Sequence, residues 1–239
     1  MAPPATLRIP ARFNGPPGSA NGGYTCGLLA GLLDHEACEV SLRAPPPLER
    51  NLAVERGPEG VLVRDGETEV AQGRGSTLEL EAGEAVGVKD ASDAAAGGFE
   101  RWRGAHPFPS CVVCGPDRRP GDGFEIFPGP LGSGRYVAAW TPHESLAAEN
   151  GTVRSECVWA ALDCPSSAPL ANWGEGPPIV LARMTASIDA PVTAGQPHAL
   201  VSWELRREGR KREAACVLFD AGGEALARSR ALWIELRGA

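Results

Sequence analysis

The chain contains two stretches in which almost every residue is apolar, and each is followed by segments in which apolar and polar residues alternate. The apolar stretches lie within residues 21–34 and 150–163. A segment that is apolar on all sides predicts a helix surrounded by other elements, whereas alternation predicts strands with one buried face. The hydrophobic pattern therefore predicts a central helix followed by several strands, and it predicts this arrangement twice.

Turn-forming residues divide the alternating segments into short strands. After the second apolar stretch we expect strands near 180–188, 199–205, 212–219 and 225–236. After the first stretch we expect strands near 39–44, 51–56, 60–64 and 68–81. Consecutive strands joined by turns favour an antiparallel meander, so the predicted fold class is α+β.

Three pairs of segments match between the two halves and occur in the same order. The ungapped pair 21–34 and 150–163 begins with Asn-Gly and ends with Leu-Asp in both halves. The other matches are Ser41-Leu-Arg-Ala-Pro45 with Ser187-Ile-Asp-Ala-Pro191, and residues 63–80 with 218–236. One match could arise by chance in a chain rich in Ala and Gly, but three in register indicate an internal duplication.

The duplication suggests where the helices begin and how the chain is divided. Asn21 and Asn150 are good N-cap residues, because an asparagine side chain can accept a hydrogen bond from an amide of the first helical turn. We expect a first unit over 1–82, a linker over 83–135 and a second unit over 136–239.

Composition and charge narrow the classes of function. With 43% hydrophobic and 22% charged residues, the chain is typical of globular proteins, and no apolar run approaches the roughly 20 residues of a membrane-spanning helix. The net charge is -7 and the one basic cluster, Arg206–Arg212, falls at an expected turn, so nucleic acid is a poor candidate partner. The first residues lack the apolar core of a signal peptide, so we expect a cytoplasmic protein without a membrane partner.

Three segments carry a family resemblance: Phe13–Tyr24 before the first helix, Val40–Leu48 after it, and Trp159–Pro165 at the end of the second. They resemble the hotdog superfamily, in particular the double-hotdog acyl-CoA thioesterase-like proteins. The resemblance covers most of the chain outside 83–135. It implies a tandem (double) hotdog, in which each unit is a central helix wrapped by a curved antiparallel sheet. Hotdog sheets usually pair edge to edge, so a homodimer is also left open.

The resemblance further implies an acyl-CoA or acyl-carrier thioesterase-like hydrolase, acting on a small-molecule acyl thioester between the two units. Asn21-Gly22-Gly23 stands where hotdog thioesterases of one type have His-Gly-Gly. Glycines let a carbonyl group approach closely, and the start of a helix carries a partial positive charge. We therefore expect the Gly23 amide to bind the thioester oxygen, although Asn21 and the glycines could equally form only a helix start.

The acid that such a reaction needs is harder to assign. The family places it at a position that falls on Ala30 or Trp159, and neither is acidic. Glu156 and Asp163 are the nearest substitutes, and Glu156 stands out because a carboxylate in an apolar helix must be paired, exposed or functional. If the units pack as a pair, Gly23 could face Glu156. Glu156 could also pair with Arg154 or Arg183, and Asp163 could merely close its helix.

Other outcomes stay open on the sequence alone. Gly22, Tyr24 and Trp159 are the expected substrate contacts. A protein that binds acyl groups or acyl-CoA without hydrolysing them is the main alternative. A dehydratase or hydratase of the same fold is the third hypothesis, and the lack of an Asp/His pair argues against it.

The spacing of two cysteines invites metal chemistry. Cys111-Val-Val-Cys114-Gly115 has the form of a zinc knuckle, in which the glycine lets backbone amides point at the thiolates. A closed site needs four ligands, which His106 and either Cys157 or Cys164 could complete. A redox pair and plain reduced cysteines are the alternatives, so we expect no required cofactor and keep zinc as an option.

Overall fold

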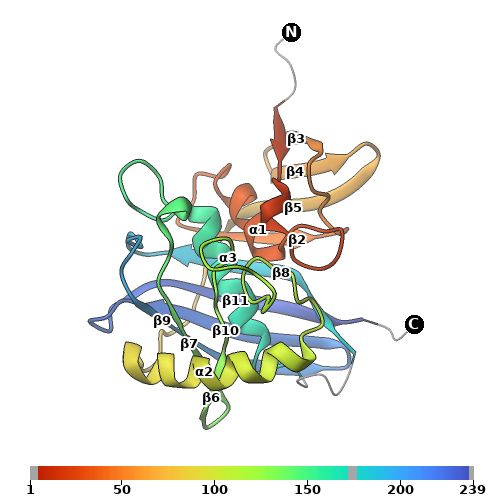
Figure 1. Cartoon of the computed structure of the whole chain (residues 1–239). Helices are drawn as coiled ribbons and strands as arrows, with labels where there is room; N and C mark the ends of the chain where they lie inside the picture. Colours follow the sequence, from red (N-terminus) through yellow and green to blue (C-terminus); the bar gives the residue numbers. More distant parts are fainter. Residues whose placement is uncertain (1–4, 172–176, 237–239) are drawn as a thin grey trace.

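A computed structural model describes residues 5–171 and 177–236 of the chain. These residues form an eleven-stranded sheet in which every pairing is antiparallel, and three α-helices lie on it (Figure 1). Among the described residues, no helix is both long enough and apolar enough to cross a bilayer. The predicted α+β class is therefore confirmed.

The strands agree closely with those that the alternating pattern predicts. The first half contains β1 (Thr6–Arg8), β2 (Ala37–Leu42), β3 (Asn51–Gly57), β4 (Gly60–Asp65) and β5 (Thr68–Ser76). The remaining strands are β6 (Gly129–Gly132), β7 (Arg135–Trp140), β8 (Ile179–Ile188), β9 (His198–Glu208), β10 (Lys211–Phe219) and β11 (Ala225–Glu235). The strand predicted over 68–81 ends five residues early, and β1, β6 and β7 were not predicted.

On both sides of the sheet's centre, the four strands that follow each predicted helix are arranged in the same order: the first strand in sequence lies innermost, followed by the fourth, the third and the second. The full order is β1-β3-β4-β5-β2-β8-β11-β10-β9-β7-β6. Outward from β2 come β5, β4 and β3, and outward from β8 come β11, β10 and β9. The central pair β2 and β8 joins the two sides, with Val40 opposite Met184 and Cys38 opposite Ala186.

The two predicted central helices are α1 (Gly22–Ala30) and α3 (Ser155–Ser167), and they pack against each other (Figure 1). Small residues permit the close approach. An added Cβ at Gly27 would lie 2.5 Å from the Glu156 Cα, and one at Gly23 would lie 2.4 Å from the Asp163 Cβ. Every residue of α3 from Cys157 onwards is buried, as the pattern predicts for a helix surrounded by other elements.

The predicted start of the second helix was wrong. Asn21 does cap α1, since its side chain accepts a hydrogen bond from the Tyr24 amide. Asn150 caps no helix, and instead accepts hydrogen bonds from the amide and the hydroxyl of Thr152. Thr152 and its neighbour are bridged to other extended segments, which holds this part of the backbone extended until α3 begins at Ser155.

The predicted linker contains a third helix that the sequence pattern did not reveal. Helix α2 (Val88–Ala105) packs on β6, β7 and β9, on the opposite face of the sheet from α3. Its buried residues are Ala91, Gly98 and Trp102, and the first two contribute little apolar surface to the sequence pattern. Gly129 passes so close to the helix that an added Cβ would lie 2.0 Å from the Ala94 oxygen. After α2 the chain crosses back towards α1, where the Val112 amide donates to the Asn14 oxygen.

Candidate functional site

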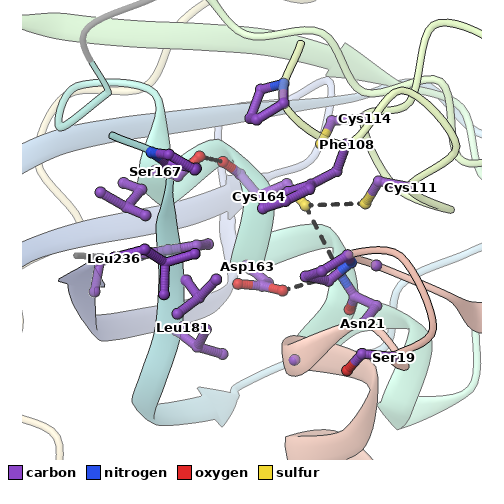
Figure 2. A pocket seen from close by; sticks show the side chains of 18 of the residues that line it. Ser19, Asn21, Phe108, Cys111, Cys114, Asp163, Cys164, Ser167, Leu181 and Leu236 are labelled. Carbon is purple, nitrogen blue, oxygen red and sulfur yellow. Dashed lines mark hydrogen bonds between the residues drawn. The ribbon is translucent and has the colours of Figure 1, made fainter. Parts of the chain in front are cut away.

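A cavity of about 670 Å³ opens beside the start of α1. Its walls come from the start of α1 with the residues before it, the second half of α3, and residues 42–46 at the end of β2 and beyond. The first residues of β8, the last residues of β11, and the end of α2 with the segment that follows it complete them. Most of the lining is apolar, and Figure 2 shows part of it, including Phe108, Leu181 and Leu236. The polar groups that line it are Ser19, Asn21, Arg43, Arg101, His106, Cys111, Cys114, Asp163, Cys164 and Ser167.

Among the described residues that line this cavity, Asp163 is the one with a carboxyl group, and only 2% of the residue is exposed. Its Oδ2 accepts hydrogen bonds from the Asn21 Nδ2 at 3.0 Å and from the Gly23 amide at 2.8 Å. Its Oδ1 is buried and has no hydrogen-bond partner among the described residues. The start of α1 thus fixes one oxygen of the carboxyl group and leaves the other unengaged (Figure 2).

Burial makes this carboxyl group a weaker acid than an ordinary aspartic acid. Loss of solvent raises the pKa of Asp163 to about 7, and the negative charge of Cys111 adds to the increase. Hydrogen bonds from Gly23 and Asn21 stabilise the carboxylate and limit the rise. The group therefore exists in both protonation states near neutral pH.

Asn21 joins the helix cap to the carboxyl group. Its Oδ1 accepts a hydrogen bond from the Tyr24 amide at 2.8 Å, which leaves its Nδ2 to donate to Asp163. The backbone oxygen of Asn21 also accepts the Thr25 hydroxyl at 2.9 Å. With both ends of its amide engaged, Asn21 holds the Asp163 side chain in one orientation.

The two glycines at the start of α1 have different surroundings. The Gly23 amide, which we expected to bind a thioester oxygen, already donates to Asp163. Gly22 lines the cavity, and within 5–171 and 177–236 no group accepts a hydrogen bond from its amide. Because Gly22 is the first residue of the helix, its amide shares the partial positive charge of the helix start.

Glu156, the acid that the sequence favoured, lies away from the cavity. Its carboxylate pairs with the Arg154 Nε at 3.0 Å, and 16% of its side chain is exposed. Glu156 lies on α3 opposite Gly27 of α1, whereas Asp163 lies opposite Gly23. The pairing with Arg154 that the sequence left open is therefore present, and the expected Gly23–Glu156 pair is not.

Of the three expected substrate contacts, only Gly22 lines the cavity. Tyr24 is buried and its ring stacks on Phe13 with the centroids 3.8 Å apart. Trp159 is buried too, and its backbone and Cβ lie against the glycines of α1. Both aromatic residues belong to the packed core in the described structure.

Three cysteines meet at one wall of the cavity. The sulfur atoms of Cys111, Cys114 and Cys164 all lie within 4.8 Å of one another, and those of Cys111 and Cys164 are 3.7 Å apart (Figure 2). Of the two candidates to join the Cys-x-x-Cys pair, the structure selects Cys164. Cys157 lies elsewhere, with its sulfur 3.7 Å from an Arg154 nitrogen.

His106 also lines this wall, and both of its ring nitrogens are engaged. The Phe108 amide donates to Nδ1 at 2.9 Å, so Nε2 carries the hydrogen and points it at the Cys114 sulfur, 3.2 Å away. Hydrogen bonds from Cys114 and Cys164, together with backbone amides, hold the pKa of Cys111 well below its ordinary value in spite of burial.

Sequence reasoning missed the contribution of the predicted linker to this site. Trp102, Phe108 and neighbouring residues form one side of the cavity. The one recognisable motif near them in the sequence is the Cys-x-x-Cys pair. The Cys-x-x-Cys pair and the length of the segment were the available signals. Neither indicates that the segment folds back onto the end of α3.

No protein-family model matches the sequence, and no curated protein matches it either. Among solved structures, the tesB protein of Mycobacterium avium subsp. paratuberculosis matches with a TM-score of 0.62 at 12% identity, over 97% of this chain and 91% of that one. A thioesterase superfamily protein matches 57% of this chain and 66% of its own, at 19% identity and a TM-score of 0.48. The PaaI protein of the E. coli phenylacetic acid degradation operon matches 48% and 83%, at 14% identity and a TM-score of 0.43. At such low identity, the similarity to the tesB protein shows a shared fold.

Proposed function

Starting from the hotdog fold that this chain shares with the tesB protein, we propose that it hydrolyses an acyl thioester in the cavity beside Asp163. The observation that carries the proposal is the state of the Asp163 carboxyl group. It is buried in an apolar cavity, one oxygen is held by the start of α1, and the other has no partner among the described residues. A carboxyl group in these surroundings is typical of a general base.

The proposed reaction assigns a separate task to each of the two helices, with Gly22 acting from α1 and Asp163 acting from α3. A water molecule attacks the thioester carbonyl carbon while the free Oδ1 of Asp163 accepts one of its protons. The Gly22 amide donates to the carbonyl oxygen as negative charge develops on it. The C–S bond then breaks, the leaving thiolate takes the proton back from Asp163, and the carboxylic acid departs.

The lining of the cavity supports an apolar acyl group as the part of the substrate that enters. Leu42, Leu181, Ile179 and Trp233 supply side chains to its walls, and its volume of about 670 Å³ suits a small organic molecule. Asn21 and Gly23 orient the carboxyl group without contacting the reacting atoms. They are positioning residues in this proposal, whereas Asp163 and Gly22 act on the substrate.

We also propose that the two sides of the sheet are two hotdog units that arose by duplication, with one working site between them. The strand order outward from β2 and β8 supports two units. Of the two central helices, α1 has the Asn21 cap followed by two glycines, and α3 carries the buried Asp163 four residues before its end at Ser167. The corresponding residues are Thr152 and Asp34, and Asp34 is exposed.

The decisive experiment compares Asp163→Asn with wild type on a panel of acyl-CoAs, with released thiol as the readout. We expect the variant to lose about 10²- to 10⁴-fold in kcat/KM, the range typical of a lost general base. Asp34→Asn is the matched control, because it makes the same change at the exposed, sequence-equivalent position. Glu156→Gln is a second control, and both should keep wild-type activity.

Folding must be checked in parallel, since a buried group is altered. Asparagine retains an oxygen that can accept from Asn21 and Gly23, so we expect the thermal midpoint of Asp163→Asn not to fall below that of wild type. Tight acyl-CoA binding by wild type without thiol release would contradict hydrolysis and support the non-catalytic binder instead. Equal activity in Asp163→Asn and wild type would remove Asp163 from the mechanism.

A further inference from the structure

The three sulfur atoms at the cavity wall have the spacing of a metal site. Zinc binds thiolates at about 2.3 Å, so two thiolates of a tetrahedral zinc ion lie about 3.8 Å apart. The Cys111 and Cys164 sulfur atoms are 3.7 Å apart, and the Cys114 sulfur lies within 4.8 Å of both. All three residues are buried, as suits ligands of a firmly held ion.

We propose that Cys111, Cys114 and Cys164 bind one zinc ion through their thiolates. The local backbone supports this assignment, because the turn after Cys114 can only be made with glycine. An added Cβ at Gly115 would lie 2.5 Å from both the nitrogen and the oxygen of Cys111, and the Gly115 amide donates to that oxygen at 2.9 Å. This tight turn brings Cys111 and Cys114 together on one side of the loop.

His106 has the arrangement of a group that supports a thiolate without binding the metal. Its Nδ1 accepts the Phe108 amide, and its Nε2–H faces the Cys114 sulfur at 3.2 Å. A hydrogen bond of this kind stabilises negative charge on a ligand sulfur and fixes its direction. Three thiolates therefore form the protein's share of the site, and the fourth position is left to a small molecule from the cavity that they line.

Two simpler interpretations fit the cluster less well. A disulfide between Cys111 and Cys164 would leave the third buried thiol without a role. Three neutral thiols would make weak hydrogen bonds to one another in a place where apolar side chains could pack instead. Thiolates neutralised by a divalent, thiol-seeking cation satisfy all three sulfur atoms at once.

The proposed ion would tie together parts of the chain that are far apart in sequence. Cys111 and Cys114 lie in the segment after α2, whereas Cys164 follows Asp163 in α3. Binding would hold that segment against α3 and so keep the cavity wall closed beside the carboxyl group. Its loss should loosen the segment first.

The test is the metal content of the full-length protein purified from zinc-supplemented cells under reducing conditions. We expect about one zinc per chain in wild type and less than a tenth of that in Cys111→Ala and Cys164→Ala. Cys157→Ala is the matched control, since Cys157 is a buried cysteine that lies in α3 with Cys164 but outside the cluster. This variant should keep its zinc. Zinc-free wild type, or equal loss in the Cys157 control, would overturn the proposal.

A measurement on wild type alone covers the case in which the variants fail to fold. With metal bound, Cys111, Cys114 and Cys164 should resist alkylation in the native protein, and a strong chelator should make them react, as mapped by mass spectrometry. Replacement of zinc by Co²⁺ should add a sulfur-to-cobalt charge-transfer band. A mass two units lower than the reduced chain, with no metal, would show a disulfide and overturn the zinc site.

Discussion

At the scale of single residues, Asn21 connects stability to the proposed chemistry, because one amide both caps α1 and holds Asp163. Its two roles can be separated. Asn21→Ser keeps an N-cap oxygen but no longer reaches Asp163 with an N–H donor, whereas Asn21→Ala removes both functions.

We therefore expect the two Asn21 variants to differ in stability and to agree in activity. Asn21→Ala should lower the free energy of unfolding by about 1 kcal/mol relative to Asn21→Ser, the usual value of a cap. Both should lose roughly 10- to 150-fold in kcat/KM, which corresponds to about 1.5–3 kcal/mol for a hydrogen bond to a charged group. Urea unfolding and thiol release measure the two effects, and wild-type activity in Asn21→Ser would exclude a positioning role.

The residue scale is also where the sequence was least informative. Asp163 and Glu156 lie in the same apolar helix, and nothing in the pattern indicates which one faces a cavity. The answer depends on the register between α1 and α3, which places Asp163 at Gly23 and Glu156 at Gly27. That register follows from how two helices and a sheet pack together, and periodicity within one helix does not contain it.

At the scale of elements, the pair α1 and α3 is held by the close approach that Gly27 permits. A methyl group at this position would lie 2.5 Å from the backbone Cα of Glu156 and 2.8 Å from the Trp159 Cβ. Backbone atoms cannot rotate away, so the helices would have to separate.

Gly27→Ala should therefore lower the free energy of unfolding by about 1–3 kcal/mol, as is usual for overpacking in a core. Gly31→Ala is the matched control at the end of the same helix. An added methyl group there would first meet the Gly27 oxygen at 3.5 Å, an ordinary contact, and the backbone at Gly31 is helical. Urea denaturation of both variants is the measurement, and equal effects would contradict the proposed helix contact.

The predictions of elements succeeded or failed for identifiable reasons. Strand β8 was predicted because apolar residues alternate with more polar ones along it, and it packs against both α1 and α3. Strand β10 was located instead by the turn-forming residues at its two ends, since nearly all of its residues are buried. Helix α2 was missed because two of its three buried residues, Ala91 and Gly98, are small, and a single large apolar residue, Trp102, makes no periodic pattern. The start of α3 was misplaced because Asn150, a good cap by composition, is held in an extended segment by pairing of the residues after it.

At the scale of the whole molecule, the two sides of the sheet share one interior. The helices α1 and α3 contact each other along their lengths, and β2 pairs with β8 at the centre of the sheet. The largest cluster of buried apolar side chains contains Leu29 from one half and Leu162 from the other. Separation of the halves would expose the inner faces of both helices.

We therefore expect the two halves to unfold in one transition, and the positions of the tryptophans make this measurable. All six tryptophans lie at Trp102 or beyond, so fluorescence reports on the second half and α2, whereas far-ultraviolet circular dichroism reports on the whole chain. Urea curves from the two probes should coincide, which is a standard test of two-state behaviour.

The variant Gly27→Ala sharpens this test, because it alters a residue of the first half that contacts the second. If the interior is shared, the fluorescence midpoint should fall together with that of circular dichroism, although no tryptophan lies in α1. If the halves were independent, the first half would unfold at a lower urea concentration, seen by circular dichroism alone. Such a separate transition would contradict a site built between the halves. The cavity needs Asn21 and Asp163 side by side, so it cannot persist once the two halves have separated.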